Sequence, residues 1–256
     1  MNIISMIKKE FKESTKNYKI IIIPVVFTLL TMMTPIMTLF LPDLLKNTSD
    51  LPAGTIIEIP PVELTDMLNT FFTDIPQLTS ITIILLLMGT ICNERNSGVA
   101  SMVLVKPIST TSFFLSKLFS NSVLILVSYF LGNLISLYYC DLIKGGVNFS
   151  DGLLGILLVL PLIFLIITIT MFFSSFLKSP LGVAGASFGT TLLLLMVPQY
   201  ISKSLVKFSP NTLLTNSTKL LSGAEVTNIA EPIIVTLGLS LILIVAACLI
   251  FKNQEF

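Results

Sequence analysis

The chain has 256 residues, of which 54% are hydrophobic and 11% charged, and its 15 basic and 14 acidic side chains nearly balance. Its mean hydropathy is +0.94. Because about a quarter of the residues in a soluble domain are charged, this composition excludes a soluble globular protein and indicates an integral membrane protein. The absence of histidine also excludes Ser-His and Cys-His nucleophile pairs and histidine metal sites.

The segment 1–19 is predicted to form an amphipathic helix at the membrane surface. Ile3, Ile7 and Phe11 repeat every four residues, while lysines and glutamates fill the other face. The simpler alternative is a cytosolic segment whose positive charges only fix the topology. We expect no cleaved signal, because the apolar run that follows is too long and lacks a small-x-small cleavage site.

Six uncharged apolar segments follow, each close to the roughly 20 residues that a helix needs to cross a bilayer. They are 20–41, 75–92, 118–139, 153–177, 181–200 and 233–251. The second is the shortest, and it reaches back to Phe71 if Pro76 lies in the first turn of its helix. Pro24, Pro35 and Pro161 fall inside spans, where we expect kinks. The predicted fold is an all-α polytopic membrane protein that forms one transmembrane domain.

The positive charges predict the orientation. With both termini in the cytoplasm, ten basic residues lie inside and five outside. The loop 93–117 is then cytoplasmic, and the loop 201–232 lies outside. Within the outer loop, Ile201, Leu205 and Phe208 are spaced like one face of a short interfacial helix.

Several kinds of chemistry are not expected in this chain. Cys92, Cys140 and Cys248 lack CxxC spacing and are interpreted as packing residues. The six spans lack Asp, Glu and His, which proton- and sodium-coupled transporters need. The string LSGAE at 221–225 resembles the LSGGQ signature of ATP-binding cassettes, but it lies in the outer loop and no GxxxxGK[ST] phosphate loop exists. Any ATP that this protein uses must therefore be bound by another chain, and no nucleic acid partner is expected.

The stretch CNERNSGVASMVLVKPIST, residues 92–110, interrupts two apolar walls with the adjacent charges of Glu94 and Arg95. We expect a helix from Glu94 to about Val105, which Pro107 would end. The glutamate would lie in its first turn, where the helix dipole favours an acid. Such a short amphipathic helix at the inner surface is interpreted as a docking element for a cytosolic partner, and the alternative is a polar connector.

This stretch resembles the membrane-spanning subunits of type 2 ABC transporters. That family typically has a glutamate at the end of span two, a glycine four residues on, a leucine-containing stretch, and then proline, serine and lysine before span three. The matching residues are Glu94, Gly98, Leu104, Pro107, Ser109 and Lys117. The basic start KKEFKE also fits, whereas Val99 and Thr110 depart from the threonine and arginine that are usual in the family.

The resemblance implies a six-helix permease of a bacterial cell membrane. It implies a dimer with a second protomer, the same or a homologous chain, and coupling to two separate ATPase subunits that bind ATP and Mg. It assigns ATPase coupling to Glu94, Arg95, Gly98 and Pro107. It further implies that this chain is a transport subunit, not an enzyme, and binds no cofactor itself.

In that family the second and fifth spans line the central pathway. Their candidate lining residues are Thr79, Thr82, Thr90, Ser187, Thr190 and Thr191. Gly182, Gly185 and Gly189 give the fifth span a small surface typical of helix or dimer packing. An apolar pathway with a few hydroxyls suits export of a hydrophobic or amphipathic substrate such as a peptide, toxin, drug or lipid. The alternatives are an ion-coupled secondary transporter or channel without an ATPase, and a membrane scaffold that transports nothing.

Overall fold

The computed structural model describes residues 3–46, 64–98, 109–201, 206–221, 224, 226 and 228–252, and this part of the chain contains helices and no strands. The helices are α1 (Ile3–Lys16), α2 (Lys19–Thr31), α3 (Met33–Lys46), α4 (Leu64–Leu87), α5 (Cys92–Asn96), α7 (Thr110–Lys144), α8 (Phe149–Phe176), α9 (Pro180–Ile201), α11 (Asn211–Leu221) and α12 (Ala230–Lys252). Among the described residues, six helical segments are long and apolar enough to cross a membrane. The predicted all-α polytopic fold with six spans is therefore confirmed.

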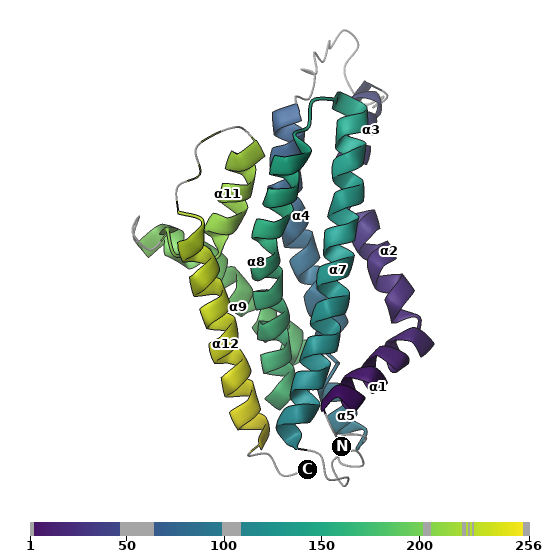
Figure 1. Ribbon diagram of the computed structural model, residues 1–256, viewed down its shortest axis with the longest axis vertical. Coiled ribbons are helices and arrows are strands. Elements are labelled where there is room, and N and C mark those ends of the chain that lie inside the picture. Colours follow the sequence, from purple (N-terminus) through teal and green to yellow (C-terminus); the bar gives the residue numbers. More distant parts are fainter. Residues whose placement is uncertain are drawn as a thin grey trace.

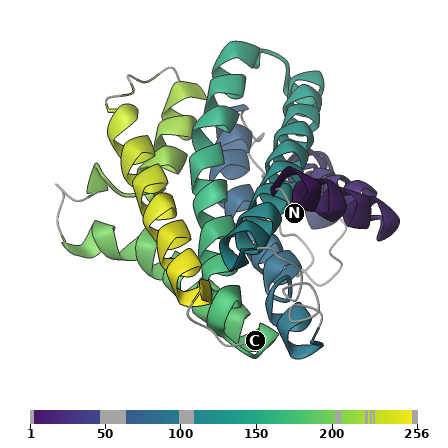
Figure 2. The same ribbon diagram turned by 60° about the horizontal axis from the view of Figure 1, so that its bottom comes forward.

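The six segments are Lys19–Met37, Asp66–Asn96, Thr110–Lys144, Phe149–Phe176, Pro180–Pro198 and Ala230–Lys252. Figure 1 shows that α1, α5 and the end of α12 lie at the same end of the bundle. We name this the inner end, because the charge count predicts that it faces the cytoplasm. Seen from that end, α1 lies across the foot of the bundle and not along it (Figure 2).

Helix α8 lies at the centre of the bundle. It packs against α4, α7, α9, α11 and α12, and Figure 1 shows it between α7 and α12. In its most apolar window 67% of the residues are buried, compared with 17% in the windows of the fifth and sixth spans. Helices α9 and α12 therefore leave most of their apolar surface free for lipid or for another chain.

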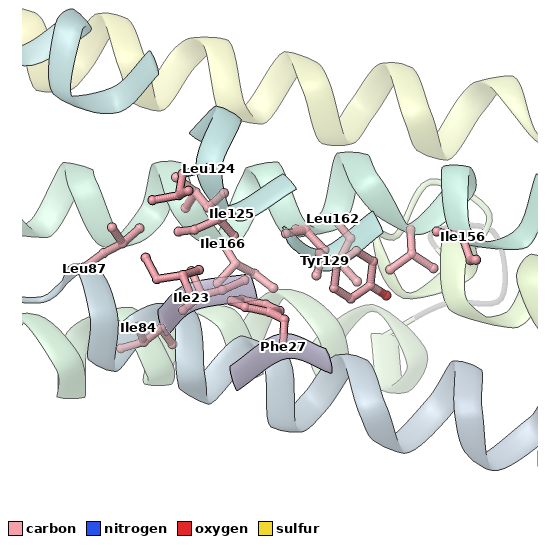
Figure 3. Packing of buried hydrophobic residues seen from close by; sticks show 14 of the residues in the cluster. Ile23, Phe27, Ile84, Leu87, Leu124, Ile125, Tyr129, Ile156, Leu162 and Ile166 are labelled. Atoms are coloured by element: carbon pink, nitrogen blue, oxygen red, sulfur yellow. The ribbon is translucent and has the colours of Figure 1, made fainter. Parts of the chain in front are cut away.

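The buried apolar core extends over α1, α2, α4, α7, α8, α11 and α12, and four of these helices meet at its centre. Figure 3 shows buried side chains of α2, α4, α7 and α8 in contact: Ile23, Phe27, Ile84, Leu87, Leu124, Ile125, Tyr129, Ile156, Leu162 and Ile166. The rings of Phe27 and Tyr129 meet edge to face, with their centroids 6.4 Å apart. Because lipid is as apolar as these side chains, close packing and not exclusion of water holds such helices together.

The first span is interrupted at Met32, between α2 and α3. Pro35 has no N–H with which to reach the carbonyl of Thr31, four residues earlier. The Ser136 hydroxyl of α7 donates a hydrogen bond to that carbonyl at 2.7 Å, and the Thr31 hydroxyl donates to the Gly132 carbonyl at 2.9 Å. A neighbouring helix thus satisfies the backbone group that the proline frees. Pro24, like Pro161 of α8, lies inside its helix.

Helix α4 begins earlier than either predicted start of the second span. It starts at Leu64, so Pro76 lies inside the helix, and the expectation that this proline falls in the first turn is wrong. The reason is an amphipathic pattern that a hydropathy window overlooks. Met67, Leu68 and the adjacent pair of phenylalanines, Phe71 and Phe72, are buried, while the polar residues between these pairs remain exposed.

The loop 201–232 contains a helix at a different position from the one expected at 201–208. Helix α11 spans Asn211–Leu221 and packs on α8 and α4. Ser217, which is fully buried, donates a hydrogen bond to the Gly155 carbonyl of α8 at 3.0 Å. Residues 202–205, half of the interfacial helix expected at 201–208, lie outside the described residues, and positions 207 and 208 form a turn.

Candidate functional site

The stretch after the second span forms a short helix and a turn. Helix α5 begins at Cys92, two residues before the predicted start, and ends at Asn96. Gly98 then has a φ of 73°, a left-handed conformation that favours glycine. The predicted continuation to Val105, and with it Pro107, lies outside the described residues. The helix expected to run without interruption from Glu94 to about Val105 therefore ends at Asn96.

A buried cluster of three charges connects α5 with two other helices. The ammonium of Lys117 on α7 donates to both carboxylate oxygens of Glu10 on α1, at 3.0 and 3.1 Å. It also donates to Oε1 of Glu94 on α5 at 2.7 Å. The side chains of Lys117, Glu10 and Glu94 are 2%, 8% and 20% exposed, respectively. We call Glu10, Glu94 and Lys117 the inner triad.

The inner triad has the features of a strong ion pair. Buried charges require partners, and each lost partner leaves an uncompensated charge that costs several kcal/mol. Lys117 also lies 5.2 Å from the centre of the Phe113 ring, close enough for a cation–π contact. The two carboxylates exceed the one ammonium by one negative charge, so the triad as a unit carries about −1 when all three groups are ionised.

Arg95 joins α5 to the C-terminal end of α8. Its guanidinium donates from Nη1 to the Ser175 carbonyl at 3.0 Å and from Nη2 to the Leu177 carbonyl. The amide of Asn96 donates to the Lys178 carbonyl at 2.7 Å. The last carbonyls of a helix lack partners within it and carry partial negative charge, so a guanidinium is well matched to them.

Ser174 of α8 fastens the start of α5. Its fully buried hydroxyl accepts hydrogen bonds from the backbone N–H groups of Ile91 and Cys92, at 3.2 and 3.3 Å, and donates to the Met88 carbonyl at 3.3 Å. The Cys92 thiol donates to the Lys178 carbonyl at 2.9 Å. The cysteine thus has a packing and hydrogen-bonding role. Taken together, α5 is fixed to α1, α7 and α8 at once.

Sequence reasoning identified Glu94, Arg95 and Gly98 but not their partners. Lys117 was noted only as the lysine that precedes span three, and Glu10 only as part of the basic start. A signal existed for Glu10, because it lies one turn after Met6 on a different side of the helix from the lysines, and both residues are buried. No sequence pattern pointed to Ser174.

A polar cavity of about 340 Å³ lies beside the inner triad, between α1, α4 and α7. Glu13, Lys19 and Asn121 contribute to its lining. Oε2 of Glu94 and the Ser120 hydroxyl are buried there, without a hydrogen-bond partner among the described residues. The cavity gives the Glu94 side chain space to rearrange relative to Lys117.

The predicted pathway residues of α4 and α9 fall into two groups. Thr79, Ser187 and Thr191 are buried, and their hydroxyls have no hydrogen-bond partner within the described part of the chain. Thr82, Thr90 and Thr190 form the second group and are only partly buried. The Thr82 hydroxyl donates a hydrogen bond to the Leu78 carbonyl of its own helix. Thr90, which follows the end of α4 at Leu87, lines the polar cavity beside the inner triad and not the pocket that Thr191 lines.

Thr191 opens into a pocket of about 290 Å³ between α4, α9 and α11. Its polar lining comes from Gln77, Ser80, Thr191 and Asn211, and its apolar lining from Ile81, Phe188, Leu192, Leu195, Met196 and Leu214. Such a mixture of a large apolar wall and a few polar groups is typical of sites for amphipathic molecules. Helix α11 forms one of its walls.

The small residues of α9 lie on a side that no other described part of the chain covers. A Cβ atom built on Gly185 or Gly189 would meet no atom within 4 Å, and one built on Gly182 would meet only Ser179. By contrast, a Cβ on Gly152 of α8 would come within 2.5 Å of Leu137. The glycines of α9 are therefore not needed for packing within one protomer.

The structure is that of a multi-pass helical membrane protein. Its short helix α5, after the second span, is connected to α7, α1 and α8. Comparison with known proteins agrees with this class: residues 4–256 match the family described as ABC-2 family transporter protein, and the chain belongs to this family. The chain is also 24% identical over 146 residues to the uncharacterized transmembrane protein YxlG of Bacillus subtilis (strain 168). That match covers 57% of each of the two chains.

Proposed function

We propose that this chain is the membrane subunit of an ATP-driven exporter and is powered by separate ATPase subunits in the cytoplasm. The observation that carries the proposal is the attachment of α5. The inner triad holds it to α1 and α7, and Arg95 with Asn96 holds it to the end of α8. Membership of the ABC-2 family supports the same function.

The attachment determines how motion would pass through the chain. A partner that pushes on the insert after α4 would move α7 and α8 through their charged or buried hydrogen bonds with α5, and α1 through the Lys117 ammonium that Glu10 and Glu94 share. Glu94 and Arg95 use their charges inside the chain. We therefore propose that they transmit the force of the ATPase by anchoring α5.

The substrate that fits best is hydrophobic or amphipathic. The pocket between α4, α9 and α11 has six apolar and four polar lining residues and no charged one. A small hydrophilic ion or sugar would lose its hydration there without adequate replacement. A molecule with an apolar body and a few hydrogen-bonding groups would find a matching lining.

A second protomer would complete the pathway. The open glycine side of α9 offers close approach of another helix, as small residues do in membrane helix pairs. Two permease chains and two ATPase chains then form the transporter, with ATP and Mg bound in the ATPase chains. The position of α1, α5 and the end of α12 at one end of the bundle fits cytoplasmic termini (Figure 1).

The test is transport by the complex in liposomes. In liposomes whose ATPase subunits face the outer solution, a fluorescent amphipathic probe should be transported from that solution into the lumen. This transport should require ATP and stop with vanadate, and ionophores that collapse proton and sodium gradients should have no effect. The alternative, an ion-coupled secondary transporter or channel, gives the opposite pattern. Transport that continues without ATP and stops when the gradients collapse would overturn the proposal.

A further inference from the structure

An apolar groove of about 240 Å³ lies between α1 and the lower parts of α7 and α8. Its lining comes from Ile3, Ile7, Leu115, Leu118, Phe119, Ser122 and Phe164. Phe119 is 52% exposed, so the groove opens toward the surroundings of the bundle and not toward its core. In a membrane, those surroundings are lipid.

Helix α1 presents three different sides, which follow from its 3.6-residue period. Met6 and Glu10 face the bundle and are buried. Ile3 and Ile7 line the groove, and the adjoining Ile4 is 58% exposed. Next to this apolar side comes a row of exposed lysines, at positions 8, 9, 12 and 16. A helix with this pattern lies at the boundary between headgroups and acyl chains, and Figure 2 shows α1 lying across the foot of the bundle.

Ser122 gives the groove a polar group at a defined depth. The residue is only 5% exposed, and its hydroxyl has no hydrogen-bond partner among the described residues. It lies five residues beyond Lys117 on α7, which places it about 7.5 Å farther from the inner end along the helix axis. Because Lys117 contacts α1, which is expected to lie at the boundary between headgroups and acyl chains, we expect this hydroxyl just below the headgroups, at the depth of phospholipid ester carbonyls.

We propose that the groove binds one anionic glycerophospholipid of the inner leaflet. An acyl chain packs on Leu118, Phe119 and Phe164, an ester carbonyl accepts a hydrogen bond from Ser122, and the phosphate group lies near the lysines of α1. Lys8 and Lys12 are the lysines next to the exposed apolar side, and their long side chains can reach the headgroup. The lipid would hold α1 in place and, through Glu10, the inner triad. The proposal requires only a membrane around the chain and does not rest on the proposed transport function.

The chain contains no tryptophan, so a single introduced tryptophan can report on the groove. Phe119→Trp places the reporter in the groove, and Leu249→Trp places a control on the exposed side of α12, near the same end of the bundle. The full chain in phosphatidylcholine nanodiscs receives equal fractions of brominated phosphatidylglycerol or brominated phosphatidylcholine, and quenching is compared. Because a lysine near a membrane surface favours anionic lipid by roughly fivefold, we expect the anionic lipid to be preferred at position 119 by about threefold or more, and at position 249 by far less.

Two variants separate the parts of the site. Lys8→Gln with Lys12→Gln should bring the preference at position 119 close to one, while the matched pair Lys144→Gln with Lys207→Gln, at exposed lysines predicted to lie outside, should leave it unchanged. Ser122→Leu should fill the groove and reduce quenching by both lipids at position 119, without effect at position 249. Equal quenching by the two lipids at position 119, or a preference that survives loss of Lys8 and Lys12, would overturn the proposal.

Discussion

Lys117 on α7 and Glu10 on α1, which are 107 positions apart in the chain, form a buried ion pair whose N–O distances are 3.0 and 3.1 Å. Glu94 shares the same ammonium at 2.7 Å, so the amino-terminal helix and the insert after the second span are held by one lysine. This contact connects the amphipathic start of the chain to the insert that we propose transmits the motion of the ATPase. A segment that only fixed topology would need no such partner.

Lys117→Met should destabilise the protein by roughly 3 to 5 kcal/mol, because it leaves two buried carboxylates without a counter-charge. Thermal unfolding of the purified chain in detergent measures the loss. Lys178→Met, the same exchange at an exposed lysine of the inner end, is the matched control and should have little effect. Adding Glu10→Gln to Lys117→Met should recover part of the loss, and a further loss of stability instead would contradict the pairing.

Arg95→Lys should uncouple the transporter although it keeps the charge. A lysine cannot donate simultaneously to the carbonyls of Ser175 and Leu177 in the fork geometry of a guanidinium. We expect normal amounts in the membrane but loss of the substrate stimulation of ATP hydrolysis in the purified complex. Lys178→Arg, the reverse exchange at an exposed position, should keep the stimulation. If Arg95→Lys is stimulated like the wild type, the anchoring of α5 to α8 has no part in coupling.

Ser136→Ala should lower stability by about 0.6 to 1.7 kcal/mol, the range typical of hydrogen bonds between membrane helices. The loss should shrink when Pro35→Ala is also present, because residue 35 then has an N–H for the Thr31 carbonyl. Ser128→Ala, which removes a buried hydroxyl that bonds within α7, is the control and should cost the same with and without Pro35. Unfolding of the four combinations gives the answer, and an equal cost of Ser136→Ala in both backgrounds would refute the explanation.

Gly185→Leu with Gly189→Leu should prevent dimer formation without unfolding the protomer. A Cβ atom at either position meets no atom of the described residues within 4 Å, so we expect a bulky residue there to disturb mainly a contact with another molecule. Gly238→Leu on α12, where a Cβ would likewise meet no atom within 4 Å, is the control. Cross-linking in the membrane measures the dimer. A dimer that persists in the double variant but disappears with Gly238→Leu would move the interface from α9 to α12.

The six spans could be predicted because a membrane helix needs a long apolar run, and hydropathy registers such runs directly. The start of α4 and the whole of α11 could not, since both bury apolar residues on one side only and polar or charged residues interrupt their apolar runs. Their burial depends on α8, which a sequence window does not include. The position of Glu94 and Arg95 in the sequence points to them, but their partners come from distant segments that meet only in the folded bundle. Lys117 donates to Glu94, and the carbonyls of Ser175 and Leu177 accept from Arg95.

The most direct test of the central claim is purification of the tagged chain from its native membrane at its natural level. The account predicts that an ATPase chain accompanies the wild-type protein, that vanadate-sensitive ATP hydrolysis accompanies this complex, and that the isolated chain has none. It also predicts that Glu94→Ala with Arg95→Ala reaches the membrane but loses either the ATPase or its stimulation by substrate. A wild-type chain that carries no ATPase, or a double variant that binds its ATPase and exports at the wild-type rate, would contradict the account.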